Sequence, residues 1–368
     1  MSTVSRSQIF LSLISGLLIT THAYSNPTVG VWNIVSTLAG STGGYAEGTG
    51  ASARFNYPYG IAVHSSGTIY VADSANHRIR SISSAGTTSV FAGSGTAGTT
   101  EGTGASAQFN NPYGVAVDSS GTLYVSEYTN HRIRKITSAG VTSLLAGSAQ
   151  GYAEGTGSGA RFDRPYSVAV DSSGTVYVAD FFNSRIRRIT SAGVTSTLAG
   201  SSTGGYLEGT GGAAQFGTPI DVAVDSSGTV YVTDTYTQRV RKITSGGVTS
   251  LLAGSNTIGY AEGTGASARF SSPYGIAVDS SGTAYVADSD NHRIRKITSG
   301  GTTSLIAGTG IAGTAGGSGA GAQFNYPAGI DVDSSGSLYI ADSSNHLIRK
   351  IDALQIYINT DTYSSNCF

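Results

Sequence analysis

Residues 109–146 read FNNPYGVAVDSSGTLYVSEYTNHRIRKITSAGVTSLLA, and this stretch decides the fold. It contains four runs of about five residues that are rich in Val, Ile, Tyr and Thr, at 114–118, 122–127, 132–136 and 142–146. Asp-Ser-Ser-Gly and Ser-Ala-Gly sequences separate runs and are short enough for hairpins, in which glycine supplies positive φ angles. The stretch does not keep a 3.6-residue period. It therefore predicts a four-stranded antiparallel sheet.

The same pattern recurs along the chain at a nearly constant interval. Six prolines mark the copies with spacings of 54, 53, 54, 54 and 54 residues, and they are Pro58, Pro112, Pro165, Pro219, Pro273 and Pro327. A single sheet of this kind cannot bury both of its faces, so neighbouring copies must stack. Radial stacking also removes the open ends of a linear array. The sequence therefore predicts an all-β, six-bladed β-propeller.

Ring closure is predicted from the two ends of the repeat. A copy of the fourth run, at 34–40, precedes the first proline unit, whereas the last unit ends after Ile351. We therefore expect the N-terminal strand to complete the last blade. Residues 354–359 also alternate like a strand and are the alternative for that position, although they match the repeat less well. The predicted propeller domain spans 31–357, and 358–368 form a C-terminal tail.

The composition fits a folded protein and excludes some partners. Hydrophobic residues make up 39% of the 368 residues, which is enough for a sizeable core. The 52 glycines and a charged fraction of 12% fit a turn-rich repeat. The net charge of −1 provides no basic field for a phosphate backbone, so we expect no nucleic-acid partner.

Residues 1–25 have the pattern of a secretory signal peptide. Arg6 lies in a short polar start, the run 9–19 is apolar, and Ala23 and Ser25 are small residues suited to cleavage. An uncleaved anchor or a buried strand is the alternative. We expect a secreted, periplasmic or cell-surface protein with no stable membrane insertion after cleavage. The single cysteine, Cys367, excludes an internal disulfide, and we expect a monomer with a free tail thiol rather than pairing between chains.

The repeated signatures P-Y-G-[IV]-A-V-D, Y-V-A-D and N-H-R-I-R resemble those of NHL repeats, in a secreted type with about 54 residues per repeat. The resemblance implies a six-bladed propeller. It implies no single activity, because the family includes sensor domains, amidating lyases and RNA-binding platforms. Related lactonases hold a metal in the central channel with Glu, Asn and Asp ligands, and no local motif here matches those ligands.

Carboxylates that recur in every blade have predictable structural roles. Asp118 and its equivalents precede Ser-Ser-Gly, where the side chain caps its own turn. Asp73 and its equivalents are placed to pair with Arg78 or Arg80 of the same hairpin. The recurring histidines are predicted to form structural hydrogen bonds, because side chains on neighbouring blades lie too far apart to share a zinc ion; they are His77, His131, His292 and His346.

Six of the 22 carboxylates break the repeat, and two of these six fall on innermost strands. Asp221 takes the place of Gly60, and Asp331 takes the place of Ala62. The two positions share a parity, so both side chains are predicted to face the same side of their strands, toward the channel. They could hold a calcium or zinc ion or act as an acid/base pair. Hydrogen bonding to backbone or buried water is the alternative.

Aromatic residues also break the repeat on one face of the predicted propeller. The loop between the second and third strands carries Tyr128, Phe181, Phe182 and Tyr236 in blades two to four, whereas it is small and polar elsewhere. The Pro-Tyr loops of the same face add further tyrosines and one unrepeated arginine, and these are Tyr59, Tyr113, Tyr166, Tyr274 and Arg164. Such a patch is typical of a surface that binds a peptide or sugar. Packing between blades is the alternative.

These features predict an exported, non-catalytic binding or scaffold propeller that recognises a protein, peptide or glycan through this aromatic face, without a cofactor. The alternative is a channel-centred, metal-dependent hydrolase or lyase of the lactonase or amidating-lyase kind. That enzyme would use a calcium or zinc ion near Asp221 and Asp331.

Overall fold

The structure is a computed structural model that describes residues 29–353 and 355–358. The predicted signal peptide, residues 359–368 of the predicted tail and Cys367 lie outside the described residues. Residues Trp32–Gln355 form one compact unit. The other unit contains most of a two-stranded sheet of β1 (Val29–Trp32) and β29 (Gln355–Ile358).

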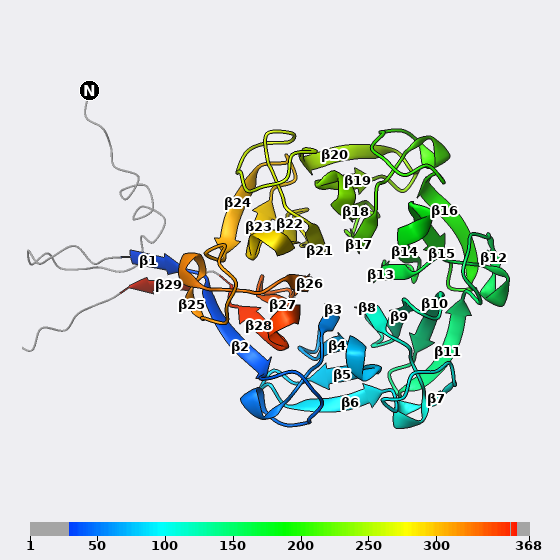
Figure 1. Cartoon of the computed structure of the whole chain (residues 1–368), viewed down its shortest axis with the longest axis horizontal. Coiled ribbons are helices and arrows are strands. Elements are labelled where there is room, and N and C mark those ends of the chain that lie inside the picture. The colour runs from blue at the N-terminus through cyan, green and yellow to red at the C-terminus, as the bar shows by residue number, and fades with distance from the viewer. Residues whose placement is uncertain (1–28, 354, 359–368) are drawn as a thin grey trace, which may run out of the picture. The chain divides into compact units, whose positions relative to one another are not determined.

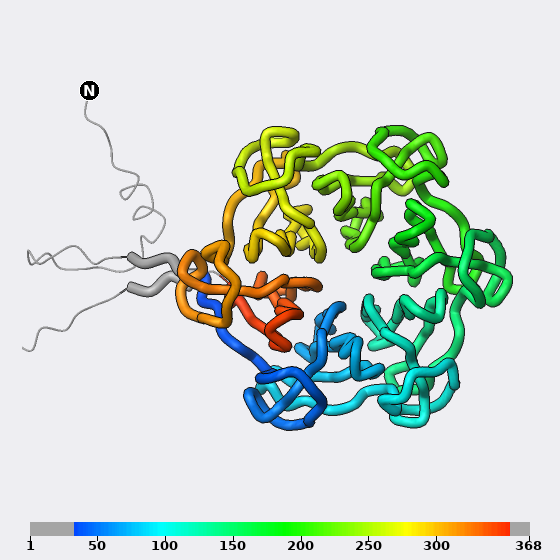
Figure 2. The backbone as a smooth tube through the Cα atoms, in the orientation of Figure 1, coloured from blue at the N-terminus to red at the C-terminus, as the bar shows by residue number. Residues whose placement is uncertain are grey.

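The compact unit consists of six antiparallel sheets arranged around a central axis (Figures 1 and 2). The inner strands are β3 (Pro58–Val63), β8 (Pro112–Val117), β13 (Pro165–Val170), β17 (Pro219–Val224), β21 (Pro273–Val278) and β26 (Pro327–Val332). The second strands are β4 (Ile69–Asp73), β9 (Leu123–Glu127), β14 (Val176–Asp180), β18 (Val230–Asp234), β22 (Ala284–Asp288) and β27 (Leu338–Asp342). The third strands are β5 (Arg78–Ile82), β10 (Arg132–Ile136), β15 (Arg185–Ile189), β19 (Arg239–Ile243), β23 (Arg293–Ile297) and β28 (Leu347–Ile351). The outer strands are β6 (Thr88–Ala92), β11 (Val141–Ala146), β16 (Val194–Gly200), β20 (Thr249–Gly254), β24 (Thr303–Ala307) and β2 (Ile34–Gly40). The prediction of a six-bladed, all-β propeller is confirmed.

Short elements complete the blades. Two-residue strands pair with three of the outer strands, and they are β7 (Gly102–Thr103), β12 (Gly155–Thr156) and β25 (Gly317–Ser318). Five 3-10 helices follow second strands, and they are η2 (Ser74–Asn76), η5 (Phe181–Asn183), η7 (Thr235–Thr237), η8 (Ser289–Asn291) and η10 (Ser343–Asn345). Five others lie in the Gly-rich loops, and they are η1 (Gly50–Ser52), η3 (Gly104–Ser106), η4 (Gly157–Gly159), η6 (Gly211–Ala213) and η9 (Gly319–Gly321). Among the described residues, no helix has the length and apolar character needed to cross a membrane.

The inner strands begin at the repeated proline, two residues earlier than the run of β-forming residues suggests. Pro112 pairs with Glu127, and the register then shifts before Val115 pairs with Val125. Proline is tolerated there because an inner strand is the edge of its sheet and faces the channel. The irregularity leaves the residue after the proline, the tyrosine of the Pro-Tyr loop, free of a regular strand partner at the channel mouth.

The N-terminal strand closes the ring. Strand β2 pairs antiparallel with β28, from Val35 opposite Ile351 to Gly40 opposite Leu347, and it is the outer strand of the last blade. The prediction from the repeat is therefore confirmed. The alternative is excluded, because residues Gln355–Ile358 pair with β1 instead.

The core lies between blades. The six repeated phenylalanines have no exposed surface, and they are Phe55, Phe109, Phe162, Phe216, Phe270 and Phe324. Each belongs to a cluster that joins two consecutive blades; Phe216, for example, packs with Ala179 of blade three and Val232 of blade four. These rings therefore fill the core between blades.

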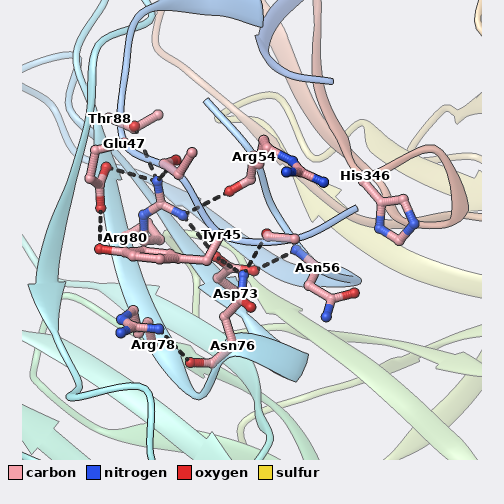
Figure 3. A network of polar contacts seen from close by, with 12 residues as sticks. Tyr45, Glu47, Arg54, Asn56, Asp73, Asn76, Arg78, Arg80, Thr88 and His346 are labelled. Carbon is pink, nitrogen blue, oxygen red and sulfur yellow. Dashed lines mark hydrogen bonds and ion pairs between the residues drawn. The ribbon is translucent and has the colours of Figure 1, made fainter. Parts of the chain in front are cut away.

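A buried arginine organises each blade, as Figure 3 shows for the first one. Arg80 is fully buried, and its guanidinium group donates to Asp73 Oδ2 at 2.8 Å. The same group donates to Glu47 Oε2 at 2.7 Å and to the carbonyl oxygens of Arg54 and Ala46. The network therefore joins the second strand, the third strand and the Gly-rich loop. The predicted scaffold ion pair is confirmed, and in this blade it uses Arg80, three residues after His77.

The repeated histidines connect consecutive blades. His77 has a left-handed backbone (φ +55°), and its Nδ1 accepts a hydrogen bond from the Asn111 backbone N–H at 3.1 Å. Equivalent bonds join His131 to Arg164 and His346 to Tyr57. Burial lowers the pKa of these histidines, which favours the neutral ring that such a bond requires. The prediction of structural hydrogen bonding is confirmed.

Replacing Asp180 by alanine should strongly destabilise the fold. Asp180 is the only carboxylate that pairs with the buried Arg187 in the described part of the chain, so D180A leaves an uncompensated buried charge. We expect a loss of about 3–5 kcal/mol in the free energy of unfolding, measured by chemical denaturation. The control D352A removes a partly exposed carboxylate paired with Lys350 and should cost no more than about 1 kcal/mol. Equal losses in the two variants would contradict this role of the buried pair.

Candidate functional site

Four tyrosines close one end of the central channel. They follow the repeated proline in four blades, and they are Tyr59, Tyr113, Tyr166 and Tyr274. We call them the tyrosine cluster. Tyr166 lies at its centre with 8% of its surface exposed, and its hydroxyl group lies 2.5 Å from the Tyr274 hydroxyl group. Tyr59 and Tyr113 stack with ring centroids 4.5 Å apart. Burial raises the pKa of Tyr274 to about 12, so the cluster remains uncharged at neutral pH.

Glycines let the inner strands approach each other beneath this cluster. A Cβ atom at Gly275 or Gly329 would overlap the backbone of the next inner strand. Ser167 and Asp221 replace this glycine in blades three and four, and Ser167 Oγ donates a hydrogen bond to Asp221 Oδ1. Neighbouring inner strands therefore approach closely directly below the tyrosine cluster.

An aromatic patch extends from the tyrosine cluster over blades two and three. Tyr128 stacks on Tyr113 with ring centroids 4.5 Å apart, and Phe181 packs on Tyr166 at 5.6 Å. Phe182 contacts Phe181 edge to face and is 52% exposed. We use the name aromatic patch for Tyr128, Phe181 and Phe182.

Arg164 covers the aromatic patch. Its guanidinium carbon lies 4.8 Å from the centroid of Phe182 and 5.5 Å from that of Tyr128. The side chain is exposed, so the cation and the aromatic rings present a combined surface to solvent. The structure thus brings together Arg164 with all the predicted binding aromatics of blades two and three.

Tyr236 is not part of this arrangement. It occupies the outer of the two variable positions in its loop, where its Cβ faces Gly217, and 74% of its surface is exposed. Among the described residues, no aromatic ring stacks on it. Thr235 occupies the inner position, and its hydroxyl group donates to the Pro273 carbonyl oxygen instead. Tyr236 is therefore a separate exposed ring on blade four.

The opposite half of the same face is hollow. A cavity of about 400 Å³ is lined by Tyr57, Tyr59, Ser272, Tyr274, Ser289, Asp290, Tyr326, Ala328, Ser343 and Ser344. It exists because blades five, six and one carry serine, alanine or aspartate where the aromatic patch carries rings. The reasoning from sequence missed this cavity, which we call the Asp290 pocket. The signal was present, because Tyr57 and Tyr326 are aromatic where the other blades have Asn, Arg, Thr or Ser before the proline.

The central channel holds the two unrepeated carboxylates. Asp221 and Asp331 both line a cavity of about 170 Å³ that is surrounded by all six inner strands. Asp221 Oδ2 accepts a hydrogen bond from Ile276 N at 2.8 Å, and Asp331 Oδ2 accepts one from Val63 N at 2.7 Å. Each carboxyl group therefore binds the inner strand of the next blade, and Asp331 does so across the closure between blades six and one.

Both channel carboxyl groups have raised pKa values. Burial raises the pKa of Asp221 to about 6, against the opposing effect of the Ser167, Ile276 and Val222 hydrogen bonds. Burial also raises the pKa of Asp331 to about 7, and the negative charge of Asp221 adds to this shift. Their side chains face the channel cavity but lie deep within the ring, where solvent screens charge poorly. The pair can therefore hold a proton near neutral pH.

The channel residues fit a protein-built metal site poorly. The described residues contain no group of three or more His, Cys, Asp or Glu side chains that could hold a metal ion. The two carboxyl groups also accept backbone hydrogen bonds at all four oxygens. Zinc takes four ligands and calcium six to eight, so these two groups alone satisfy neither ion.

The fold and this face define a six-bladed β-propeller with a closed tyrosine layer, an aromatic patch and a pocket at one end. The sequence matches the NHL repeat at residues 55–80, 109–136, 162–189, 216–243, 270–297 and 324–351, one match in each blade. The chain therefore belongs to the NHL-repeat family.

Curated relatives are considerably longer than this chain. Protein SUPPRESSOR OF QUENCHING 1, chloroplastic, from Arabidopsis thaliana is 30% identical over 281 residues, which cover 70% of this chain and 26% of that protein. NHL repeat-containing protein 2 from Bos taurus is 29% identical over 343 residues, which cover 80% of this chain and 46% of that protein. The chain thus spans between a quarter and a half of the length of these relatives.

Solved structures with similar folds carry different functional names. A Bacteroides thetaiotaomicron protein of unknown function has a TM-score of 0.68 and 23% identity, with 88% of this chain and 76% of that chain covered. An auxiliary nutrient binding protein from the same organism has a TM-score of 0.66 and 16% identity, with the same coverage. A gluconolactonase from Xanthomonas campestris has a TM-score of 0.55 and 16% identity, with 82% and 87% covered. At these identities the likeness establishes the fold alone.

Asp331 should make stability fall as the pH rises. Its folded pKa of about 7 exceeds the ordinary 3.8, so its contribution is complete below about pH 4 and is lost as the pH rises through 7. Between pH 5 and pH 8, the free energy of unfolding of the natural protein should fall by about 1–3 kcal/mol relative to D331N. The histidines have lowered pKa values, so they reduce the free energy of unfolding at acid pH, which is the opposite dependence. Because D331N contains the same histidines, their effect cancels when the two proteins are compared.

The control for this measurement is D118N. Although burial acts in the other direction, hydrogen bonds from Ser120 and Thr122 lower the pKa of Asp118, so its carboxylate is ionised throughout this pH range. D118N should therefore change stability equally at pH 5 and pH 8. A natural protein whose pH profile runs parallel to that of D331N would show that Asp331 does not titrate in this range.

Proposed function

We propose that this protein is a non-catalytic binding propeller that recognises a protein, peptide or glycan through the face bearing the tyrosine cluster. The observation that carries the proposal is the aromatic patch beneath Arg164, which combines exposed ring area with a cation. Tyrosine, phenylalanine and arginine provide large contact areas, and both aromatic residues and arginine are enriched at protein interfaces.

The distribution of side chains on this face supports the proposal. The inner members of the patch, Tyr128 and Phe181, are fixed by contacts with the tyrosine cluster, so their rings are held before a ligand arrives. Phe182 and Tyr236 project from the outer loop positions, and both are more than half exposed. Preorganised rings lose little side-chain entropy on binding. The arrangement suits a ligand that lies across blades two to four.

Export to the periplasm, the cell surface or the extracellular space is part of the proposal. It rests on the signal-peptide pattern of residues 1–25. Of the similar folds, one is a nutrient-binding protein and another a gluconolactonase, so the choice of a binding function rests on this chain's own residues.

Removing the two exposed rings should strongly weaken recognition. The purified protein is screened on glycan and random-peptide arrays, and affinities of the hits are compared with those of F182A/Y236A. We expect at least a tenfold loss of affinity, because buried aromatic residues dominate the binding energy of interfaces. Unfolding curves of the two proteins should coincide, since both side chains are exposed.

The matched control is I258A/I311A. These residues are 67% and 66% exposed and lie in the loops that follow β20 and β24, so the change removes a comparable apolar surface elsewhere. It should leave the affinity within twofold. Unchanged affinity of F182A/Y236A for every hit would place recognition outside the aromatic patch and contradict the proposal.

A channel-centred, metal-dependent hydrolase or lyase is the second candidate. It is favoured by one observation, the pair of channel carboxyl groups with pKa values of about 6 and 7, which suit proton transfer near neutral pH. The tyrosine cluster covers one end of the channel, so a substrate would enter from the opposite end.

Metal analysis separates the two candidates. Bound calcium or zinc that disappears in D221N, together with hydrolysis of a lactone or ester that D331N abolishes, would establish the enzyme. We expect the purified protein to hold no stoichiometric metal and to remain inert after either ion is added. That expectation follows from the two-carboxylate ligand set.

A further inference from the structure

The Asp290 pocket has aromatic walls and a single charged group. Tyr57 and Tyr326 are 47% and 50% exposed, and they stand at its edge, while Tyr59 and Tyr274 separate it from the channel. His346 contacts the Tyr57 ring edge to face at 4.8 Å, and His292 contacts Tyr326 in the same way at 5.1 Å. The two outer rings are therefore held in place by residues of the preceding blades.

Asp290 keeps acceptor sites for a ligand, whereas two of the pocket serines are already hydrogen-bonded. Ser289 Oγ donates to the Pro327 carbonyl oxygen at 2.5 Å and is thereby engaged. Ser272 Oγ donates to Asp290 Oδ2 at 2.6 Å. A carboxylate has about four lone-pair sites, and one such bond occupies a single site. Among the ion pairs formed by the described residues, none includes Asp290.

The electrostatic field of the pocket is negative. Asp290 is the only lining residue that is charged at neutral pH, and it is exposed. His292 and His346 use Nδ1 to accept backbone N–H groups of Tyr326 and Tyr57, which requires the neutral ring. Tyrosine faces carry partial negative charge as well. Four aromatic rings and a carboxylate surround one cavity, and this arrangement favours the binding of a cation.

We propose that the Asp290 pocket binds an organic ammonium group, with Asp290 as its counter-ion and the rings of Tyr57, Tyr274 and Tyr326 around it. The cavity volume of about 400 Å³ is that of a small-ligand site. A free amine and the side chain of a lysine in a partner peptide present the same chemistry. The pocket selects the ammonium head, and its open edge between Tyr57 and Tyr326 admits the attached chain.

A neutral sugar or an anion suits this pocket less well. A sugar ring requires several donors and acceptors, whereas two of the four lining serines, Ser272 and Ser289, are already engaged with Asp290 and the backbone. An anion would face the carboxylate without a compensating cation, because Arg164 lies on blade three with the aromatic patch. The two halves of the face therefore carry opposite charges. The ammonium pocket gives the ligand chemistry of one half of the proposed binding face, and it rests on that proposed function.

Choline and its neutral isostere 3,3-dimethylbutan-1-ol test the charge requirement. Isothermal titration calorimetry of the natural protein should show binding of choline at least tenfold stronger than that of the alcohol. Because this comparison needs no variant, it is independent of folding defects. Equal affinity for the two compounds would mean that the pocket recognises shape alone and would overturn the inference.

The variant D290N tests the counter-ion. We expect choline affinity to fall at least fivefold, while D352N should leave it unchanged. Asp352 follows the end of β28 that lies away from this face, so D352N removes the same charge at a distance. Unfolding curves recorded alongside identify any loss of structure. Unchanged choline affinity in folded D290N would overturn the inference.

A pair of peptides distinguishes the two sources of the ammonium group, a free amine and a lysine side chain. Acetyl-Gly-Lys-Gly-amide is compared with acetyl-Gly-Gln-Gly-amide in the same titration. Stronger binding of the lysine peptide than of choline supports a peptide ligand, the reverse order supports a free amine, and binding of neither overturns the inference.

The proposed function and the pocket can fail separately. F182A/Y236A leaves every residue of the pocket in place, so it should retain choline affinity within twofold. Loss of array binding in F182A/Y236A with no choline binding by the natural protein would retain the binding face and reject the ammonium pocket. Choline binding by the natural protein, together with unchanged array binding in F182A/Y236A, would retain the ammonium pocket and reject the aromatic patch as the site of recognition.

Discussion

The buried arginine of each blade is the constraint on which the rest of the propeller depends. A guanidinium group with no exposed surface is tolerable only when several acceptors surround it, and each blade supplies a second-strand carboxylate and carbonyl oxygens of the Gly-rich loop. These acceptors come from segments that are distant in the repeat, so the unit must fold as a whole. Arg80 also lies over the Phe55 ring at 4.8 Å, which connects the polar network to the hydrophobic core between blades. Loop, hairpin and core are thereby fixed relative to one another in every copy.

The variation that shapes the candidate binding face lies at positions that this network does not use. The residue before the proline, the residue after it and the two loop positions after each second strand differ among blades, and all of them lie at one end of the ring. Bulky residues there produce the aromatic patch over blades two and three, and small residues produce the Asp290 pocket over blades five, six and one. The same scaffold thus carries a cationic half and an anionic half without any change to its six buried arginines. The channel carboxyl groups have a different role from these surface residues, because each binds the backbone of the next inner strand.

Much of this was predictable from the sequence, and the failures have physical causes. The 54-residue period predicts the blades, and the motif at 34–40 predicts the closure, because both are patterns within one chain segment. The placement of Asp221 and Asp331 along the channel follows from strand parity. The separation of Tyr236 from the other rings was not predictable, since its loop has two variable positions that face different neighbours. The Asp290 pocket was missed because a cavity depends on what two or three adjacent blades lack, whereas a repeat pattern describes one blade at a time.

Closure by β2 also determines when the ring can form during synthesis. The Tyr57 backbone and the His346 side chain that meet at the closure are 289 positions apart, and the partner strands of β2, which are β25 and β28, belong to the last blade and are synthesised last. The first five blades can fold and stack in order, because each depends on contacts within itself and with its predecessor. The first blade, by contrast, keeps one flank uncovered until the last blade arrives. Nascent chains of this protein therefore carry an exposed apolar surface and an unpaired strand throughout most of translation, and these are the features that chaperones recognise and that aggregation exploits.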